Sequence, residues 1–306
     1  MRVLVLGAAG MLGRKLAARL GRDGTADELE LVDIAGAPVV ADVAEPGVAE
    51  RLVASRPDTI FHLAAVLSGE AEADLDKGYR VNLDGTRALL EAIRAVGGGY
   101  RPRVVFASTI AVFGAPFPEA IGDEFHSTPL TSYGTAKAMS ELLLADYTRR
   151  GFLDGVGIRL PTICVRPGAP NRAASGFFSS IIREPLAGED AVLPVSEDVR
   201  HWFASPRAAI GFLVHAASLD SGVLGDRRSV TMPGVSETVA GQIESLRRVG
   251  GDGAVAHIRR EPDETIARIV AGWPERFDTR RADALGFRAD ADFDEIVRVH
   301  VEDELS

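Results

Sequence analysis

The sequence contains one cysteine, Cys164, and this excludes an internal disulfide framework and a cysteine-rich metal site. Its 6 histidines form no i, i+4 pair and no HxxE pattern, so we expect no metal centre. No apolar run reaches the roughly 18 residues that a membrane-spanning helix needs. The apolar stretch near the start ends at Gly7, which is too short for the core of a signal peptide. We therefore expect a soluble, cytoplasmic protein with no membrane partner.

Positive charge is also scarce. The chain has 34 Lys and Arg against 44 Asp and Glu, which gives a formal net charge of −10. This balance repels a phosphate backbone, so we expect no nucleic-acid partner. Hydrophobic residues at 46% and charged residues at 25% are ordinary values for a globular protein and exclude a disordered or fibrous chain. The length of 306 residues suits one large domain or two closely joined ones.

The first 165 residues alternate short apolar runs with longer amphipathic stretches. The apolar runs are typical of buried strands and cover residues 3–6, 29–33, 59–65, 103–108 and 155–161. This alternation predicts an α/β fold with a Rossmann-type, doubly wound parallel sheet. After Arg166 a segment rich in proline and glycine interrupts the pattern. We predict a dinucleotide-binding domain over 1–165 with a returning helix near 206–219, and a smaller, mixed α/β substrate region over 166–306.

The motif GAAGMLG follows the first predicted strand and begins the first helix. Gly7, Gly10 and Gly13 would allow a tight turn, close approach of phosphates to the backbone, and close packing of the helix on the sheet. Met11 and Leu12 lie at the start of this helix, whose N-terminus favours an anion. We expect these five residues to bind the pyrophosphate of a dinucleotide; a purely structural turn is the alternative.

Asp33 ends the second predicted strand, about 20 residues after the glycine motif. A carboxylate at this place can accept hydrogen bonds from both ribose hydroxyls of adenosine. The same carboxylate repels a 2′-phosphate, so the sequence favours NAD over NADP. An ordinary strand-end aspartate is the alternative interpretation. Asp42 and Val43 follow a short apolar pair and are candidates to flank the adenine.

Tyr133 and Lys137 lie four residues apart on a predicted helix and hence on one face. A tyrosine with an unperturbed pKa near 10 is a poor base at neutral pH. A lysine ammonium one turn away favours the phenolate and brings its pKa toward the working range. Ser108 and Thr109 end a predicted strand, and ligands bind at these ends of open parallel sheets. Together these residues suit proton transfer between an alcohol and a carbonyl.

The glycine motif, Asp33, HLAA, NLDGT, STIAVFG and YGTAK occur in an order that resembles extended short-chain dehydrogenases/reductases of the epimerase/dehydratase type. The resemblance implies a bound NAD, Tyr133 as the catalytic acid/base and Lys137 as the residue that tunes it. It places Thr109 on the family's catalytic serine or threonine, with Ser108 beside it. It also implies a homodimer built on two helices of the first domain. The further residues that it assigns to the cofactor site are Leu63, Ala64, Ala65, Asn82, Pro161 and Thr162.

Departures from the family pattern bear on the substrate. The segment around Arg200 lacks the acidic pair usual before the following helix, and Phe113 stands where nucleotide-sugar enzymes usually carry tyrosine. Residues 159–188, with HLAAVLSGEAE before them, are similar to dehydrogenases that oxidise C2 of a four-carbon sugar acid. Aromatic residues, at 6%, leave few rings to stack on a nucleobase. The residues that we expect to contact the substrate are Ser68, Thr109, Tyr133, Asn171, Ser175 and Arg183.

The sequence thus predicts an NAD-dependent oxidoreductase that oxidises the C2 hydroxyl of a short sugar acid such as D-erythronate to the 2-oxo acid. Tyr133 would be the general base, and Arg183 would hold the carboxylate through a charge-assisted bond. Two alternatives remain open. A nucleotide-sugar epimerase or dehydratase would retain its NAD, and a non-catalytic dinucleotide sensor would bind the cofactor only to regulate a partner.

Overall fold

The computed structural model describes residues 1–168 and 174–305. The chain forms two compact units, and it passes between them more than once. The units are formed by Met1–Phe113, Ser127–Arg159 and Ile210–Thr231 (unit 1) and by Gly114–His126, Leu160–Ala209 and Met232–Ser306 (unit 2). Each unit therefore combines segments from both sides of the predicted division at residue 165.

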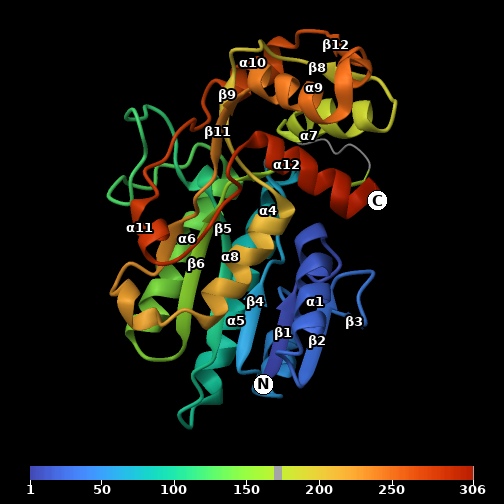
Figure 1. Ribbon diagram of the computed structural model, residues 1–306. Coiled ribbons are helices and arrows are strands. Elements are labelled where there is room, and N and C mark those ends of the chain that lie inside the picture. Colours follow the sequence, from blue (N-terminus) through green and yellow to red (C-terminus); the bar gives the residue numbers. More distant parts are fainter. Residues whose placement is uncertain (169–173, 306) are drawn as a thin grey trace. The chain divides into compact units, whose positions relative to one another are not determined.

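Unit 1 is built on a seven-stranded sheet in the order β10-β6-β5-β4-β1-β2-β3 (Figure 1). Its strands are β1 (Arg2–Leu6), β2 (Glu28–Asp33), β3 (Val39–Val40), β4 (Thr59–His62), β5 (Arg103–Thr109), β6 (Asp154–Leu160, of which Leu160 is assigned to unit 2) and β10 (Ser229–Thr231). The pairs β1–β2, β1–β4, β2–β3, β4–β5 and β6–β10 are parallel. The predicted Rossmann-type α/β fold is confirmed.

The central strands are apolar along their length because helices cover both faces of such a sheet. Leu4, Ile60 and Phe106, on three neighbouring strands, are at most 1% exposed. Full burial of a side chain of this size stabilises the fold by about 1.5–3 kcal/mol.

Helices connect these strands and carry several of the predicted site residues. They are α1 (Met11–Asp23), α2 (Val48–Val53), α3 (Ser68–Ala73), α4 (Leu75–Tyr79), the π-helical η1 (Arg80–Asp84), α5 (Gly85–Val96), the 3-10 turn η2 (Ile110–Val112), α6 (Ser132–Arg149), α8 (Pro206–Ser218, in unit 1 from Ile210) and the 3-10 turn η3 (Ser221–Leu224). Helix α1 lies in front of β1 and β2 in Figure 1. The side chain of Thr131 caps α6 by accepting a hydrogen bond from the backbone N of Gly134 at 3.0 Å. This cap fixes where the helix that carries Tyr133 and Lys137 begins.

Unit 2 is smaller and mixes short strands with helices. A three-stranded sheet contains β7 (Thr162–Ile163), β9 (Arg200–Ala204) and β11 (Val235–Thr238), and a parallel pair contains β8 (Ala191–Leu193) and β12 (Ile258–Arg260). Its helices are α7 (Gly176–Leu186), α9 (Val239–Val255), α10 (Glu264–Val270), α11 (Arg280–Ala284), α12 (Phe293–His300) and the π-helical η4 (Val301–Leu305). Phe178, Phe203 and Phe293 pack at the centre of its core. Among the described residues of both units, none of the helices combines the length and the apolar character that crossing a membrane requires.

Candidate active site

The turn from β1 into α1 tolerates only glycine at two positions, one in the loop and one in the first turn of the helix. Gly7 has φ +87°, and a Cβ there would lie 2.6 Å from the backbone N of Ala64. A Cβ on Gly13 would lie 2.2 Å from the carbonyl oxygen of Gly7. Helix α1 then begins at Met11 with no side-chain cap and no acidic residue in its first turn. Its first N–H groups therefore suit a bound anion, and binding of the pyrophosphate there stays a prediction.

The carboxylate of Asp33 is fixed beside this loop. Its Oδ2 accepts a hydrogen bond from the backbone N of Ala9 at 2.9 Å, and its Oδ1 accepts one from the backbone N of Ile34 at 2.7 Å. Each carboxylate oxygen has further lone pairs, which ribose hydroxyls can use. An uncapped helix start with a fixed carboxylate at the end of the next strand fits the adenosine diphosphate part of NAD.

Asp42 and Val43 lie after β3, and both have structural roles there. Asp42 accepts a hydrogen bond from the backbone N of Ala44 at 2.9 Å and pairs with Arg80 at 2.8 Å. Val43 is 5% exposed and belongs to the core beneath. Their predicted place beside the adenine stays a prediction.

Asn82 holds the segment that follows β4. Its Oδ1 accepts from the backbone N of Val66 at 2.9 Å, and its Nδ2 donates to the carbonyl oxygen of the same residue at 3.0 Å. Its own carbonyl oxygen accepts from Thr86 at 2.9 Å and from Ser140 on α6 at 3.2 Å. Asn82 thus holds Val66, which directly follows the half-buried Leu63, Ala64 and Ala65 that are predicted to contact the cofactor.

Lys137 lies inside the protein, with 2% of the residue exposed. Its Nζ donates to the carbonyl oxygen of Ala107 at 2.8 Å and lies 4.6 Å from the centre of the Phe106 ring and 5.9 Å from that of Tyr133. Burial lowers the pKa of Lys137 to about 7, and the charge of Glu141 opposes this shift. The predicted Tyr133–Lys137 pair therefore faces the end of β5.

The neighbouring hydroxyls of Ser108 and Thr109 differ in what they can donate. Ser108 is 3% exposed and donates to Oε1 of Glu141 at 2.5 Å. Thr109 is half-buried, and its Oγ1 accepts from the backbone N of Ala111 at 3.1 Å. Because Thr109 is an acceptor in this contact, its hydroxyl hydrogen can be donated to a substrate oxygen. This difference favours Thr109 as the predicted substrate contact and places Ser108 in a supporting position behind it.

In unit 2, a histidine fixes the orientation of the Thr162 hydroxyl. Nδ1 of His201 lies 3.0 Å from the carbonyl oxygen of Pro274, which can only accept, so Nδ1 carries the proton. Burial lowers the pKa of His201 to about 4, so the ring is neutral at pH 7 and Nε2 accepts. Thr162 therefore donates to Nε2 at 2.7 Å and keeps lone pairs to accept from a ligand N–H or O–H. Pro161, the other predicted residue here, is buried.

The predicted substrate residues have different surroundings. Ser68 begins α3 and Ser175 precedes α7, and both are half-buried. Asn171 lies outside the described residues. Arg183 on α7 pairs with Glu184 at 2.5 Å and donates to the carbonyl oxygen of Arg166 at 2.6 Å.

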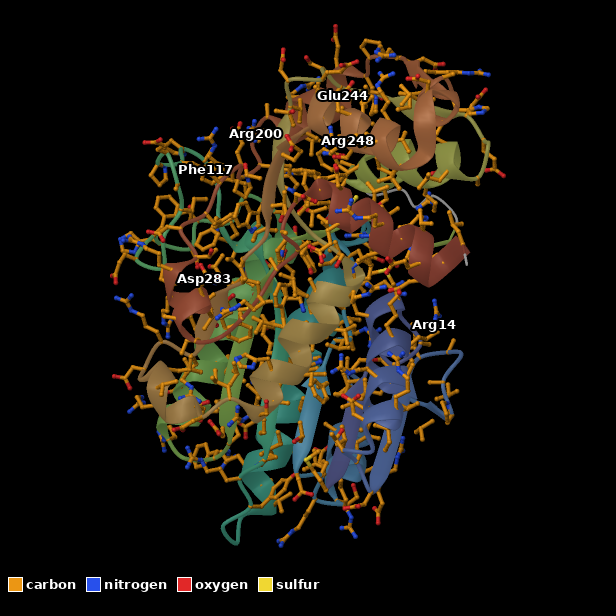
Figure 2. All side chains as sticks on the ribbon, in the orientation of Figure 1. Arg14, Phe117, Arg200, Glu244, Arg248 and Asp283 are labelled. Carbon is orange, nitrogen blue, oxygen red and sulfur yellow. The ribbon has the colours of Figure 1, made fainter. Side chains whose placement is uncertain are left out.

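The charge of Arg183 is thus already compensated by its neighbour in the chain. Arg200 on β9, labelled in Figure 2, donates to the carbonyl oxygen of Ser236 at 2.9 Å and has no acidic partner among the described residues. On charge alone, Arg200 is the better placed of the two to meet a carboxylate.

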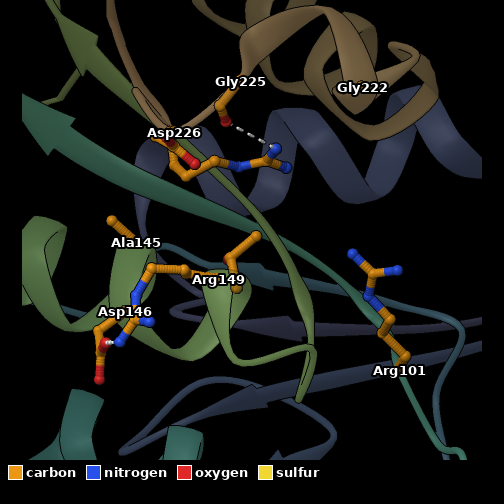
Figure 3. Close-up of a pocket in the computed structure, with 9 residues that line it drawn as sticks. Arg101, Ala145, Asp146, Arg149, Gly222, Gly225 and Asp226 are labelled. Atoms are coloured by element: carbon orange, nitrogen blue, oxygen red, sulfur yellow. Dashed lines mark hydrogen bonds and ion pairs between the residues drawn. The ribbon is translucent and has the colours of Figure 1, made fainter.

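A pocket of about 460 Å³ in unit 1 lies away from these residues (Figure 3). It is lined by Arg101, by the last turns of α6 and by the segment that leads into β10. These segments precede β5 and β10, so they mark the amino ends of the strands. Arg149 in this pocket pairs with Asp146 at 2.5 Å, and the Nη1 of Arg228 donates to Gly225 at 3.4 Å. The pocket is therefore no part of the candidate active site at the carboxyl ends.

The fold and the site define a class of protein, a Rossmann-type oxidoreductase with a tyrosine–lysine pair. Residues 3–223 match the NAD dependent epimerase/dehydratase family, and the chain belongs to that family. The predictions of an NAD-dependent oxidoreductase and of this family are confirmed.

Relatives of known name are similar to the chain over its whole length. A D-erythronate dehydrogenase of Cupriavidus necator is 46% identical over 99% of this chain and 98% of the relative. Another from Haemophilus influenzae is 42% identical over 100% of both chains. A crystal structure titled as a nucleoside-diphosphate-sugar epimerase from Agrobacterium tumefaciens is 59% identical with a TM-score of 0.97, and covers 100% of this chain and 94% of that one.

Proposed function

We propose that this protein oxidises the C2 hydroxyl of a short sugar acid such as D-erythronate to the 2-oxo acid, with NAD as acceptor. The observation that carries the proposal is the buried Lys137 beside Tyr133 at the end of β5, next to Thr109. Two relatives at 46% and 42% identity are named for oxidation of D-erythronate, which supports this substrate.

Each residue of the site has a distinct part in this reaction. Bound NAD supplies the acceptor for the hydrogen on C2. Tyr133 takes the hydroxyl proton, and the ammonium of Lys137 stabilises the resulting phenolate electrostatically. Thr109 donates its hydroxyl hydrogen to the C2 oxygen and so orients it toward Tyr133. The same hydrogen bond from Thr109 stabilises negative charge that develops on the C2 oxygen, both in oxidation of the alcohol and in reduction of the ketone.

The rest of the predicted site would hold the two ligands. Gly7, Gly10, Met11, Leu12 and Gly13 would bind the pyrophosphate, and Asp33 the adenosine ribose. Thr162 offers an acceptor that suits the amide hydrogens of the nicotinamide carboxamide. Ser68, Asn171, Ser175 and an arginine would bind the acid.

A nucleotide-sugar epimerase is the second candidate, because the 59% identical crystal structure carries that title. The two functions differ in their use of NAD: a dehydrogenase reduces added NAD, whereas an epimerase retains its cofactor and returns it unchanged.

A substrate panel separates them. The purified protein is mixed with NAD and with D-erythronate, other four-to-six-carbon sugar acids, or UDP- and dTDP-sugars, and absorbance at the reduced-nicotinamide band is followed. We expect reduction with a sugar acid and none with the sugar nucleotides. Conversion of a sugar nucleotide without net reduction would overturn the proposal in favour of the epimerase, and absence of any turnover would favour a sensor.

We also propose that the protein is a cytoplasmic homodimer. Leu142 on α6 is 73% exposed, which is unusual for a leucine in the middle of a long helix. On the same helix, Tyr147 bonds to Glu91 of α5, so the two helices form one surface. A second copy that packs on this surface would cover Leu142.

A further inference from the structure

Glu141 is a buried carboxylate that the proposed reaction does not use. It lies on α6 one turn after Lys137, with 6% of its side chain exposed. Arg159 contacts it from Nε to Oε1 at 3.0 Å, from Nε to Oε2 at 3.1 Å and from Nη2 to Oε2 at 2.7 Å. Ser108 donates to Oε1 at 2.5 Å. A charge inside a protein is costly unless it is paired and hydrogen-bonded, and Glu141 meets both conditions.

These contacts join α6 to two neighbouring strands of the sheet. Lys137 is bonded to Ala107, and Glu141, one turn later, is bonded to Ser108, so two successive turns of the helix hold two successive residues of β5. Arg159 comes from β6, next to β5 in the sheet. The next residue of β5 is Thr109, so a shift of Glu141 would move the strand end that meets the substrate.

The charges around Lys137 make Glu141 its main anionic neighbour. Burial lowers the pKa of Lys137 to about 7, and Glu141 is the residue that raises it. His62, at the end of β4, is neutral at pH 7 because burial and Lys137 lower its pKa to about 3. Tyr133 faces Lys137 from α6, and Arg159 lies beyond Glu141.

Several charged residues on the other elements packed against α6 have partners of their own, and Glu72 of α3 accepts from the backbone N of Ser132 at 2.5 Å. Lys77 of α4 pairs with Glu70 of α3, and Arg80 of η1 pairs with Asp42. Glu91 of α5 pairs with Arg94 at 2.6 Å.

We propose that Glu141, held by Arg159, is a positioning residue that keeps Lys137 charged near neutral pH and fixes Ser108 beside Thr109. It touches neither substrate nor cofactor and acts through these residues. The kinetic consequence rests on the proposed function, but the effect on Lys137 exists in the protein without any ligand.

The sequence makes the direct measurement simple, because Lys15, Lys77 and Lys137 are all of its lysines. In protein labelled with ¹³C-lysine, the Cε resonance of Lys137 is followed against pH in wild type and in Glu141→Gln. Glutamine keeps an acceptor for Ser108 but removes the charge. We therefore expect the titration midpoint of Lys137 to fall by about one pH unit or more.

A matched control separates this effect from a loss of stability. Asp154 is also a partly buried carboxylate of unit 1 paired with two arginines, Arg103 at 2.8 Å and Arg228 at 2.6 Å, but it lies at the amino end of β6. Asp154→Asn should lower Tm while leaving the titration of Lys137 unchanged.

Kinetics with a sugar acid provide a second readout. In Glu141→Gln, Lys137 loses its proton at a lower pH, and the Tyr133 phenolate then lacks its nearest cation. The rise of kcat/KM should therefore occur at a higher pH than in the wild type. Asp154→Asn should keep the wild-type profile. If the titration shifts but no sugar acid is oxidised by the wild type, the proposed function fails and the role of Glu141 in charging Lys137 stands.

Should Glu141→Gln not fold, the pair can be removed together as E141L/R159M, because apolar replacements of a buried ion pair are often well tolerated. This variant also removes the carboxylate that raises the pKa of Lys137, so it should lower the midpoint as well. An unchanged Lys137 titration in the folded variant, or an equal shift in Asp154→Asn, would show that the pair is only structural and would overturn the proposal.

Discussion

Tyr133 and Lys137 lie one turn apart on α6, and in the proposed reaction the tyrosine takes the proton. Tyr133→Phe removes the hydroxyl but keeps the ring, so we expect kcat to fall on the order of 10²-fold or more, the usual scale for a positioned general base. Affinity for NAD should barely change. Steady-state kinetics and a cofactor titration measure the two effects.

A second tyrosine on the same helix is the control. Tyr147 lies about four turns further along and bonds to Glu91, so Tyr147→Phe should keep the wild-type kcat. Wild-type turnover in Tyr133→Phe would show that another group is the base.

The arginine that holds the substrate carboxylate can be found by comparing Arg183 and Arg200. Loss of a charge-assisted bond of about 1.5–3 kcal/mol should raise KM for the acid roughly tenfold or more. Arg183 was predicted from the sequence, but Glu184 compensates its charge, whereas Arg200 has no acidic partner among the described residues. We expect Arg200→Ala to raise KM more than Arg183→Ala, with affinity for NAD unchanged in both. The reverse order would support the prediction from the sequence.

At this scale the sequence predicts residues that belong to short motifs. Short-range signals, such as a spacing of a few residues or the end of a predicted strand, are enough to single out Gly7, Asp33, Tyr133 and Lys137 as candidates. Glu141 could have been noticed as the next turn on the face of Lys137. Its partner Arg159 comes from another element, so their pairing depends on tertiary contacts that no spacing in the sequence reveals.

The strand–loop–helix element that begins the fold carries the preference for NAD. Asp33→Asn removes the negative charge at the end of β2, so we expect affinity for NAD to fall about tenfold and discrimination against NADP to narrow. Titration with both cofactors measures this. Asp58→Asn changes another aspartate that accepts from a backbone N, that of Arg2 at 2.7 Å, and should leave both affinities unchanged. Tighter binding of NADP than NAD by the wild type would contradict the assignment of Asp33.

Helix α6 is also the element on which the proposed dimer depends. A charge in place of the 73% exposed Leu142 would have to be buried at the interface, so Leu142→Glu should convert the dimer to a monomer. Val223 on η3 is 59% exposed, and Val223→Glu provides a matched surface change that should leave the mass unchanged. Light scattering after size exclusion gives the mass. A monomeric wild type would rule out the dimer.

For the whole molecule, the sequence predicts the sheet of unit 1 better than the course of the chain between the units. Buried parallel strands are continuous apolar runs, so β1, β4 and β5 could be recognised directly. Gly114–His126 and Ser229–Thr231 could not be assigned to their units, because neither segment has a periodicity of its own and its place depends on long-range contacts. The short strands of unit 2 were missed for the same reason.

The central claim is that hydrogen leaves C2 of a sugar acid for NAD. D-Erythronate deuterated at C2 tests it directly, with mass spectrometry of the cofactor and of the acid after turnover. We predict one deuterium in the reduced cofactor, none in the acid product, and formation of the 2-oxo acid. Reduced cofactor without deuterium, or an acid that keeps its deuterium, would contradict the account.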